Sequence, residues 1–333
     1  MTLEEACSIG YSTVYFTFDC IGDTILLMSA LKYLVTYDVP KVLVGTAYRE
    51  IFQNCDYIDI LDEFYEDCLS ASLFKKVVDA GINPVFISST DFVKSNNTFL
   101  PVWGEHHILH DICVKLGISQ TIPITPFFYL SEVEKLGGRF WQDNQIAIMT
   151  GGNQRYKEMS ADLAQQIIDC LKDQYHFIQI GSPNDHKLQN AMDCRGWNGI
   201  RGAAMILNQS DLFIGGIGGL MHLARAVNCR SVIAYSSAEP LSLANYSSNI
   251  NVFAPEPKCK RCGERESFPY TIQCDNHYSC IEGIKLSDMI EAVHLQLSKR
   301  NEPLEVERED IQPNAVLGME AYLKRFGSIK EIV

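Results

Sequence analysis

The chain lacks any apolar run approaching the roughly 20 residues that span a bilayer, so no transmembrane segment is predicted. Its first residues, M-T-L-E-E-A-C, carry acids where a signal peptide carries a basic region. Basic charge is also scarce, because the formal net charge is -13. This balance argues against nucleic acid as a partner and gives no support to strong polybasic attraction to anionic lipid. We expect a cytoplasmic protein, with peripheral binding at the inner membrane face left open.

Cysteine is too dilute for a disulfide scaffold, with 12 residues in a chain of 333. Most of these cysteines stand singly in apolar segments, as Cys170 and Cys229 do, and are expected to be reduced core residues. The length and the 47% hydrophobic content allow an ample core and favour two domains over one. Alternation of strand-like and helix-like segments along most of the chain predicts parallel sheets.

A glycine cluster stands between two apolar runs in the stretch from Ser210 to Tyr235, S-D-L-F-I-G-G-I-G-G-L-M-H-L-A-R-A-V-N-C-R-S-V-I-A-Y. The pattern predicts a strand, a glycine turn, a helix from Leu220 to Val227 and a second strand. A helix that begins directly after glycines presents free N–H groups and the positive end of its dipole, which suit a phosphate. His222 adds a donor. The alternative is a tight turn that binds nothing, with His222 hydrogen-bonded locally; the G-x-G-x-x-G dinucleotide pattern is absent.

A second strand, turn and helix is predicted near the N-terminus. Ser12 to Phe18 has strand character, D-C-I-G-D-T follows, and L-L-M-S-A-L-K-Y-L has helical spacing. Asp23 would lie at the start of this helix, at the carboxyl end of the sheet, where open α/β sheets bind ligands. It is either a helix cap or a general base, and Asp19 competes for the second role.

Further segments continue the alternation, with strands expected at 41–45, 84–88, 145–150 and 176–180 and helices at 69–80, 131–141, 162–171 and 286–297. Residues 301–313 are expected to form a linker or surface loop, and 314–326 a last amphipathic helix. Helical spacing also places His106, His110 and Cys113 near one face. A metal site is the less favoured interpretation there; a helix start lining the acceptor cleft is favoured.

Beyond Tyr235 the alternation gives way to a polar loop region with four clustered cysteines. The segment C-K-R-C-G-E-R-E-S-F-P-Y-T-I-Q-C-D-N-H-Y-S-C contains Cys259, Cys262, Cys274 and Cys280. Four thiolates suit a structural tetrahedral metal site, with Zn as the default and Fe as the alternative. His277 could replace one ligand. Four reduced cysteines, or two disulfides in an oxidising compartment, are the other interpretations.

Three motifs of the chain resemble glycosyltransferase family 9, the heptosyltransferase-like enzymes. They are I-G-D-T-I-L-L-M-S-A-L near the N-terminus, A-I-M-T-G-G-N-Q-R-Y-K-E-M-S in the middle, and G-G-I-G-G-L-M-H-L-A-R-A in the glycine stretch. The resemblance implies an α/β GT-B fold of two Rossmann-like domains facing a cleft. Residues 1–142 would bind the acceptor and 143–300, with the Cys-rich loop 255–283, the nucleotide sugar. Residues 301–333 would be a linker and a C-terminal helix that packs back on the first domain.

The resemblance also implies roles for individual residues. Asp23 would be the general base, and Ile217 stands where the family pattern usually has Asp. The nucleotide sugar would be bound by Gly22, Thr150, Gly151, Gly152, Lys157, Gly181, Gly218, Gly219, Leu220, Met221 and His222, with Asn184 and Asp185 near its ribose or base.

The expected activity is inverting transfer of a sugar, with heptose as the leading candidate, from an ADP-heptose-like nucleotide-diphosphate donor to a hydroxyl acceptor. The acceptor is lipopolysaccharide, another glycan, a lipid or a protein, and no catalytic metal is expected. Homo-oligomerisation stays open. The alternatives are a non-catalytic binding or assembly protein that a structural metal stabilises, and a sugar-nucleotide epimerase of the same fold.

Overall fold

Two parallel sheets are formed by separate halves of the chain. The structure, a computed structural model, describes residues 1–17, 20–62, 71–87, 91–95, 98–102, 106–256, 258, 274 and 276–311. The first sheet has the order β3-β2-β1-β4, with β1 Thr13–Thr17, β2 Val42–Gly45, β3 Ile58–Ile60 and β4 Asn83–Ile87. All three pairings are parallel. The first and fourth strands of the chain are therefore neighbours, with β4 at the edge of this sheet.

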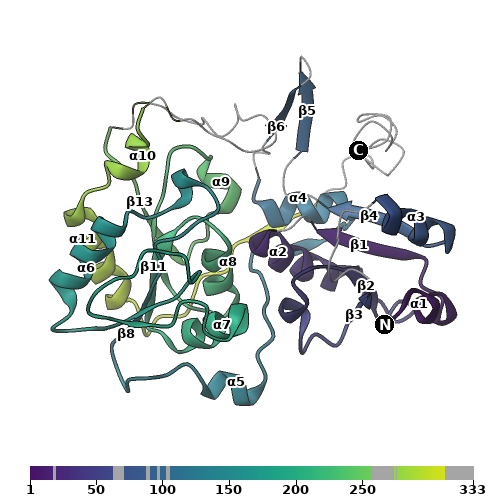
Figure 1. Cartoon of the computed structure of the whole chain (residues 1–333), viewed down its shortest axis with the longest axis horizontal. Helices are drawn as coiled ribbons and strands as arrows, with labels where there is room; N and C mark the ends of the chain where they lie inside the picture. Colours follow the sequence, from purple (N-terminus) through teal and green to yellow (C-terminus); the bar gives the residue numbers. More distant parts are fainter. Residues whose placement is uncertain are drawn as a thin grey trace.

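The first half also contains helices and a pair of antiparallel strands that projects away from the first sheet (Figure 1). They are α1 Leu3–Ile9, α2 Ile21–Leu31, η1 Lys32–Leu34, η2 Arg49–Phe52, α3 Ala71–Asp79, α4 Ile108–Lys115 and the antiparallel strands β5 Asp91–Ser95 and β6 Thr98–Val102. Thr2 caps α1 in a capping box with Glu5, which satisfies two backbone donors at the helix start. The chain then passes through β7 Thr121–Pro123 and α5 Glu132–Leu136 to the second half.

The second sheet has six parallel strands in the order β10-β9-β8-β11-β12-β13. They are β8 Gln145–Ile148, β9 His176–Gln179, β10 Ala191–Asp193, β11 Leu212–Gly216, β12 Ser231–Ala234 and β13 Asn249–Val252. In chain order this is 3-2-1-4-5-6, the order of the dinucleotide-binding Rossmann fold. The strand order reverses between β8 and β11, and ligands bind at the carboxyl ends of the strands at such a point.

The second sheet is accompanied by η4 Arg155–Lys157, α6 Ala161–Leu171, α7 Gly199–Gln209, α8 Gly219–Ala226, α9 Leu241–Ala244, α10 Ser279–Glu282 and α11 Leu286–Ser298. One core cluster unites β8, β11 and β12 with α6 and α11. Figure 1 shows α6 and α11 on the side away from the first half, and α8 toward it. The predicted α/β class with parallel sheets is confirmed; the domain boundary at 142/143 stays a prediction.

Helix α2 joins the two halves. Every residue from Thr24 to Leu31 is buried, so the helix is covered on all sides. A helix that is apolar all round belongs inside a protein, and this one packs against α4 on one side and α8 on the other. A single core cluster accordingly contains Ile25 and Leu26 together with Met221 and Leu223 of α8.

Several predicted elements differ from the structure. The helix expected at 131–141 ends at Leu136, because Gly137 and Gly138 follow and the chain at Gly138, with φ at +80°, lies against the backbone of Met205. The expected loop 301–313 contains β14 Arg308–Asp310, which pairs antiparallel with β7. The region after Tyr235 is not only loop, since β13 extends the sheet. The helix predicted at 314–326 lies outside the described residues.

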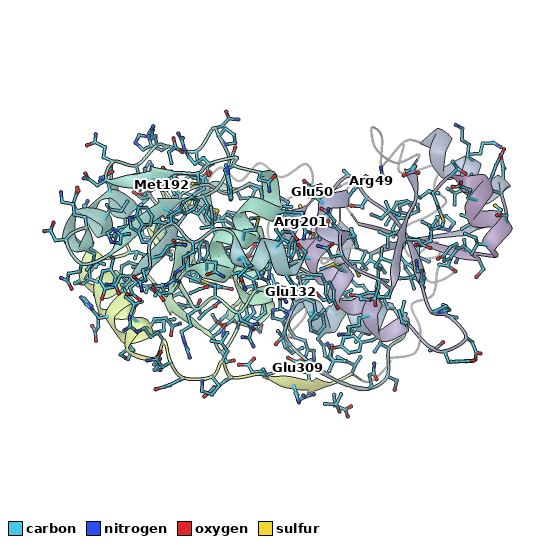
Figure 2. All side chains as sticks on the ribbon, turned by 90° about the horizontal axis from the view of Figure 1, so that it is seen from below. Arg49, Glu50, Glu132, Met192, Arg201 and Glu309 are labelled. Atoms are coloured by element: carbon cyan, nitrogen blue, oxygen red, sulfur yellow. The ribbon has the colours of Figure 1, made fainter. Side chains whose placement is uncertain are left out.

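Arg201 of α7 joins the second half to the first and to the connecting segment (Figure 2). Arg201 as a whole is 5% exposed, and its guanidinium donates to the carbonyl oxygens of Glu50 and Tyr129 at 2.9 and 2.8 Å. It also binds both carboxylate oxygens of Glu134, one of them at 2.7 Å. Arg201 lowers the pKa of Glu134 to about 2 with help from Ser131, although burial by itself raises this pKa.

Replacing Arg201 with Met should lower the free energy of unfolding by about 3 kcal/mol, because a buried ion pair loses one partner. The matched control, Arg139→Met, removes an exposed arginine and should change it by less than about 0.5 kcal/mol. Urea unfolding of both variants measures this. The pKa of Glu134 lies below its ordinary 4.5. The ionised Glu134 carboxylate therefore makes its full contribution to the free energy of unfolding above pH 4.5, and this contribution is lost as the pH falls toward 2. If the difference in free energy of unfolding between wild type and Arg201→Met stayed constant over that pH range, the assignment of the stability to the Arg201–Glu134 ion pair would be contradicted.

Candidate functional site

Asp23 lies in the first turn of α2, directly after the β1 strand and its turn. The N-cap residue of α2 is Cys20, so the interpretation of Asp23 as the helix cap is wrong. A carboxylate in the first turn still interacts favourably with the helix dipole. Asp23 is half-buried, and Asp19 lies outside the described residues. The carboxylate therefore stands at the carboxyl end of the first sheet, near the switch of strand order between β1 and β4.

The glycine stretch forms the expected strand, turn and helix. Strand β11 ends at Gly216, Gly218 is the N-cap of α8 with φ at +153°, and the helix begins at Gly219. This φ favours glycine, which explains the residue at that position. The first N–H groups of any helix lack an acceptor within it, so the start of α8 offers donors to an anion.

His222 is buried, with 5% of its surface exposed, and its Nδ1 lies 2.6 Å from the Tyr246 hydroxyl. Burial, together with the nearby Lys157, lowers the pKa of His222 to about 3. The imidazole is therefore neutral at pH 7. Tyr246 was missed from the sequence because it lies 24 residues beyond His222, in a segment with no motif.

The two helix starts touch each other across the junction of the halves. A Cβ atom on Gly22 would lie 2.9 Å from Cδ2 of His222 and 3.5 Å from Cα of Gly219. A Cβ on Gly219 would lie 3.0 Å from Cγ2 of Ile21 and 3.2 Å from the Gly22 nitrogen. Figure 1 accordingly shows α2 and α8 side by side between the two sheets. Glycine at both positions permits this approach, which places Asp23 one residue from the contact.

Lys157 adds a positive charge to the same place. Its Nζ lies 2.6 Å from Oε1 of Glu239, which also accepts from the Tyr156 hydroxyl at 3.1 Å. Burial by itself lowers the pKa of Lys157, but Glu239 and then Asp23 outweigh it and raise the pKa above its ordinary 10.5. Lys157 is therefore charged and within the electrostatic reach of Asp23. A Cβ on Gly216 would collide with the Lys157 carbonyl oxygen, so β11 and η4 lie in direct contact.

Glu239 was not among the predicted residues. It follows β12 after a short loop, at the carboxyl end of the sheet, and its side chain is 4% exposed. Its position after a predicted strand was the available signal, because that edge of a parallel sheet binds ligands. A buried carboxylate beside a lysine holds the ammonium group charged and in place.

The glycines after β8 and β9 face a carboxylate. Asp185 accepts from the Ser182 N–H at 3.0 Å, and its carboxyl group fills the space where Cβ atoms of Gly151 and Gly181 would stand. Burial raises the pKa of Asp185, against the hydrogen bonds from Ser182 and Gly151. The structure thus brings Gly151 and Gly181 together, but the group that lies between them is the Asp185 carboxyl group. An acidic group suits ribose hydroxyls better than phosphate, since a carboxylate accepts hydrogen bonds and repels anions.

Thr150, Gly152, Leu220 and Met221 were also expected at the donor site. Thr150 follows β8 with a buried hydroxyl that has no hydrogen-bond partner among the described residues. Gly152 lies beside Glu158. Leu220 and Met221 have buried side chains in the core, and the Met221 N–H donates to the Gly218 carbonyl oxygen at 3.1 Å, which leaves the Leu220 N–H as the candidate donor of the two. Ile217, where the family pattern has Asp, is 2% exposed and packs in the same core.

The four-cysteine site cannot be traced in the described part of the chain. Cys259 and Cys262 lie outside it, Cys280 is buried, and Cys274 accepts from the Tyr278 N–H at 3.2 Å. Within the described residues, metal-ligand geometry occurs instead at His106, His110 and Glu309. In the same residues, no helix is both long and apolar enough to cross a membrane.

Solved structures share the fold as a whole. A family 9 glycosyltransferase from Veillonella parvula has a TM-score of 0.62 and 14% identity, over 87% of this chain and 98% of that one. TibC, an iron-containing dodecameric glycosyltransferase of E. coli, has a TM-score of 0.63 and 14% identity, over 87% of this chain and 76% of that one. ADP-heptose lipopolysaccharide heptosyltransferase II of E. coli has a TM-score of 0.57 and 15% identity, over 86% of this chain and 99% of that one. At these identities the likeness shows the fold alone, which is GT-B, with two Rossmann-like halves.

The family model "Glycosyltransferase family 9 (heptosyltransferase)" matches residues 187–270. This segment contains the glycine turn, α8 and Glu239. No curated protein matches the chain. The resemblance to family 9 seen in the motifs is thereby confirmed, and it supports a glycosyltransferase.

Proposed function

We propose that the protein transfers a sugar from a nucleotide diphosphate donor to a hydroxyl acceptor with inversion at the anomeric carbon. The observation that carries the proposal is the contact of the α2 and α8 starts, which brings Asp23, His222 and Lys157 to one place. One half of the site then offers a carboxylate, and the other offers donors and positive charge. These are the two requirements of glycosyl transfer to an alcohol.

The donor diphosphate is assigned to the start of α8 and to Lys157. The N–H groups of Gly219 and Leu220, the helix dipole and the ammonium group together offset negative charge as the leaving diphosphate departs. This is the role that a divalent ion fills elsewhere, so no catalytic metal is assigned. Glu239 keeps Lys157 charged and oriented, and Asp185 accepts from the ribose hydroxyls of the donor.

Asp23 is assigned as the general base. Its carboxylate takes the proton of the acceptor hydroxyl as that oxygen attacks the anomeric carbon. The bond from the anomeric carbon to the diphosphate oxygen breaks on the opposite face, which inverts the configuration. The neutral His222, held by Tyr246, lies against Gly22 and adds no competing charge.

The donor is assigned as an ADP-heptose-like sugar nucleotide. Support comes from TibC, with a fold similar at a TM-score of 0.63, whose structure was solved with ADP-D-β-D-heptose. The first half would bind the acceptor, which is a lipopolysaccharide, another glycan, a lipid or a protein. The Cys259, Cys262, Cys274 and Cys280 site is proposed as a structural Zn or Fe centre on its spacing.

A thermal-shift panel of nucleotide diphosphate sugars tests the donor site. The bound donor should raise the midpoint of unfolding, since ligand at 100 times its Kd adds about 2.7 kcal/mol. The free sugar without nucleotide is the control and should leave the midpoint unchanged. No shift with any ADP-, GDP- or UDP-sugar would contradict the proposal.

The non-catalytic binding protein remains the second candidate because Ile217 is buried in the core and supplies no polar contact to a donor sugar. It predicts the same thermal shift with no transfer to any acceptor. The sugar-nucleotide epimerase instead predicts a changed sugar nucleotide without acceptor. Product analysis with and without acceptor separates all three.

A further inference from the structure

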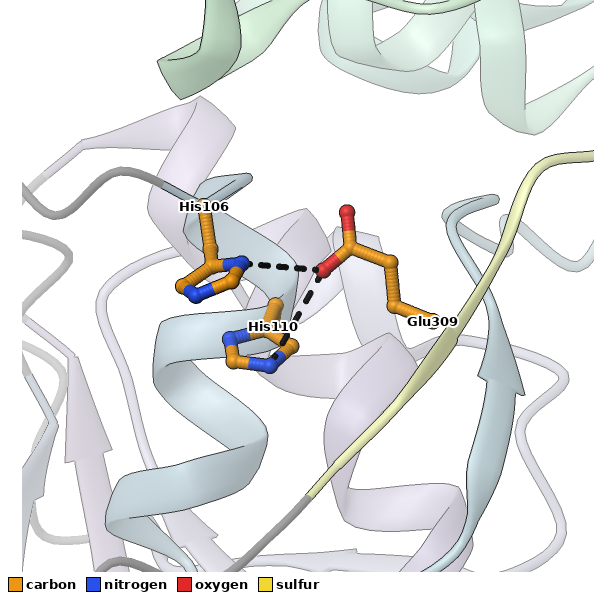
Figure 3. A group of neighbouring side chains, drawn as sticks. All are labelled: His106, His110 and Glu309. Atoms are coloured by element: carbon orange, nitrogen blue, oxygen red, sulfur yellow. Dashed lines mark ion pairs between the residues drawn. The ribbon is translucent and has the colours of Figure 1, made fainter.

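A cluster of metal-binding side chains lies beside the proposed reaction centre, where the chain after α11 returns to the first half (Figure 3). The ring of His107, the residue after His106, has its centroid 4.9 Å from that of Tyr246 and 6.4 Å from that of His222. His106 and His110 stand at the start of α4, and Glu309 belongs to β14. Glu309 Oε2 lies 3.6 Å from His106 Nδ1 and 3.8 Å from His110 Nε2. The two imidazole rings are stacked with their centroids 4.2 Å apart. Three ligand atoms therefore converge from two segments that are almost 200 residues apart in the sequence.

The spacing of these atoms fits a small divalent ion. Bonds of about 2.1 Å in a tetrahedral site place neighbouring ligand atoms about 3.4 Å apart. The one ligand atom that each residue offers lies within 4.8 Å of the others. The two separations from Glu309 Oε2 to the histidine nitrogens, 3.6 and 3.8 Å, would reach this spacing after shifts of a few tenths of an ångström. The same distances are too long for hydrogen bonds, and they correspond to ion pairs when the imidazoles are protonated.

Two further contacts support a site. His110 Nδ1 lies 3.4 Å from Oδ1 of Asp111, which turns Nε2 toward Glu309. A carboxylate on the far nitrogen is the usual partner of a metal-binding histidine. Glu309 Oε2 is buried and has no hydrogen-bond partner in the described part of the chain. An unsatisfied buried carboxylate oxygen is costly, and a cation would satisfy it.

A cavity of about 220 Å³ adjoins the cluster, lined by His106, His107, Glu307 and Glu309 with Leu241, Ser242 and Asn245 across from them. His107 is 3% exposed, and its Nδ1 accepts from the Leu109 N–H at 3.0 Å. The proton of its neutral ring is therefore on Nε2, which is buried with no partner among the described residues. His107, with its buried Nε2 donor, thus borders the cavity beside the three candidate metal ligands.

We propose that His106, His110 and Glu309 bind a divalent transition-metal ion of the Zn²⁺ or Fe²⁺ class. Two imidazoles and one carboxylate suit these ions rather than Mg²⁺ or Ca²⁺. Three protein ligands leave a position for water or another oxygen ligand in the cavity. The ion ties β14 to α4. The site goes beyond the proposed transferase activity and does not depend on it.

Cobalt substitution of the full-length chain distinguishes this site from the cysteine site. The Cys259→Ser/Cys262→Ser variant is stripped with a chelator and titrated with Co²⁺. We expect about one equivalent to bind with visible ligand-field bands and without the near-ultraviolet charge-transfer band of thiolate ligands. In the chain with all its cysteines, a second equivalent carrying that thiolate band should appear.

Variants of the proposed ligands decide the assignment. In the same background, His106→Ala and Glu309→Gln should each abolish the ligand-field signal, and Asp111→Asn should weaken Co²⁺ binding about 10- to 100-fold. The matched control is His294→Ala, which removes an exposed histidine of α11 and should leave binding unchanged. His106 is 58% exposed, so its removal should not disturb folding, which circular dichroism checks. Absence of binding in the cysteine variant, or binding unaffected by His106→Ala, would overturn the proposal.

Discussion

Asp23→Asn should lower kcat for sugar transfer by about 1,000-fold and leave the thermal shift with donor unchanged. The amide keeps the size and place of the carboxylate but cannot accept the acceptor proton, and positioned general bases contribute roughly 100- to 10,000-fold. Donor affinity should persist because the donor contacts are assigned to α8 and Lys157. Initial rates of transfer and thermal shifts with the same donor measure the two effects.

The matched control for Asp23 is Asp162→Asn. Asp162 also lies in the first turn of a helix, α6, and is exposed at a distance from the contact of α2 and α8. Both variants lose a favourable interaction of about 0.3–1 kcal/mol with a helix dipole, and Asp23→Asn also loses its attraction to Lys157. Only Asp23→Asn should stop transfer. Full turnover by Asp23→Asn would reject Asp23 as the base and leave Asp19 as the next carboxylate to replace.

Lys157→Met should lower kcat by about 100- to 1,000-fold and also weaken the thermal shift with donor. The variant removes the ammonium group that offsets charge on the leaving diphosphate, and loss of one such electrostatic contact costs about 2.7–4 kcal/mol in the transition state. It also leaves Glu239, whose side chain is 4% exposed, without its cation. A lone buried charge costs about 3–5 kcal/mol in stability, so the single variant mixes two effects.

The double variant Lys157→Met/Glu239→Gln separates stability from catalysis. Removing both charges should restore most of the lost stability, as measured by urea unfolding, while transfer stays low. Arg155→Met is the matched control, since Arg155 lies in the same η4 helix and pairs with Glu158 and Glu282 at the surface. Recovery of transfer in the double variant would show that Lys157 acts only by balancing Glu239.

Local sequence patterns were sufficient for much of the fold. Apolar runs predicted the strands at 42–45, 145–148, 176–179 and 231–234 and the helix Leu286–Ser298 to within a few residues. The glycine turn before α8 was predicted from four clustered glycines, and one of them, Gly218, has a backbone conformation that other residues avoid. Such features depend on neighbours in the chain, so they are visible in the sequence.

Prediction failed where a partner is distant in sequence. Strand β14 has only three residues and exists because β7, almost 190 residues earlier, pairs with it. The helix after Ser131 is short because Gly138 lies against Met205 of α7. The role of Asp23 as helix cap was also inferred from its neighbours in the sequence, whereas the N-cap residue of α2 in the structure is Cys20.

The sequence by itself determined the two turns, the residues they carry and the resemblance to family 9, because each is encoded in a run of a dozen residues. Only the tertiary structure decided that Gly22 touches His222, that Glu239 pairs with Lys157 and that Glu309 joins His106 and His110. The first and third of these contacts arise from the packing of α2 on α8 and of β14 on β7, and the second arises within the second half, where η4 lies against β11. Packing of distant segments depends on the shape of the whole chain, which no local pattern specifies.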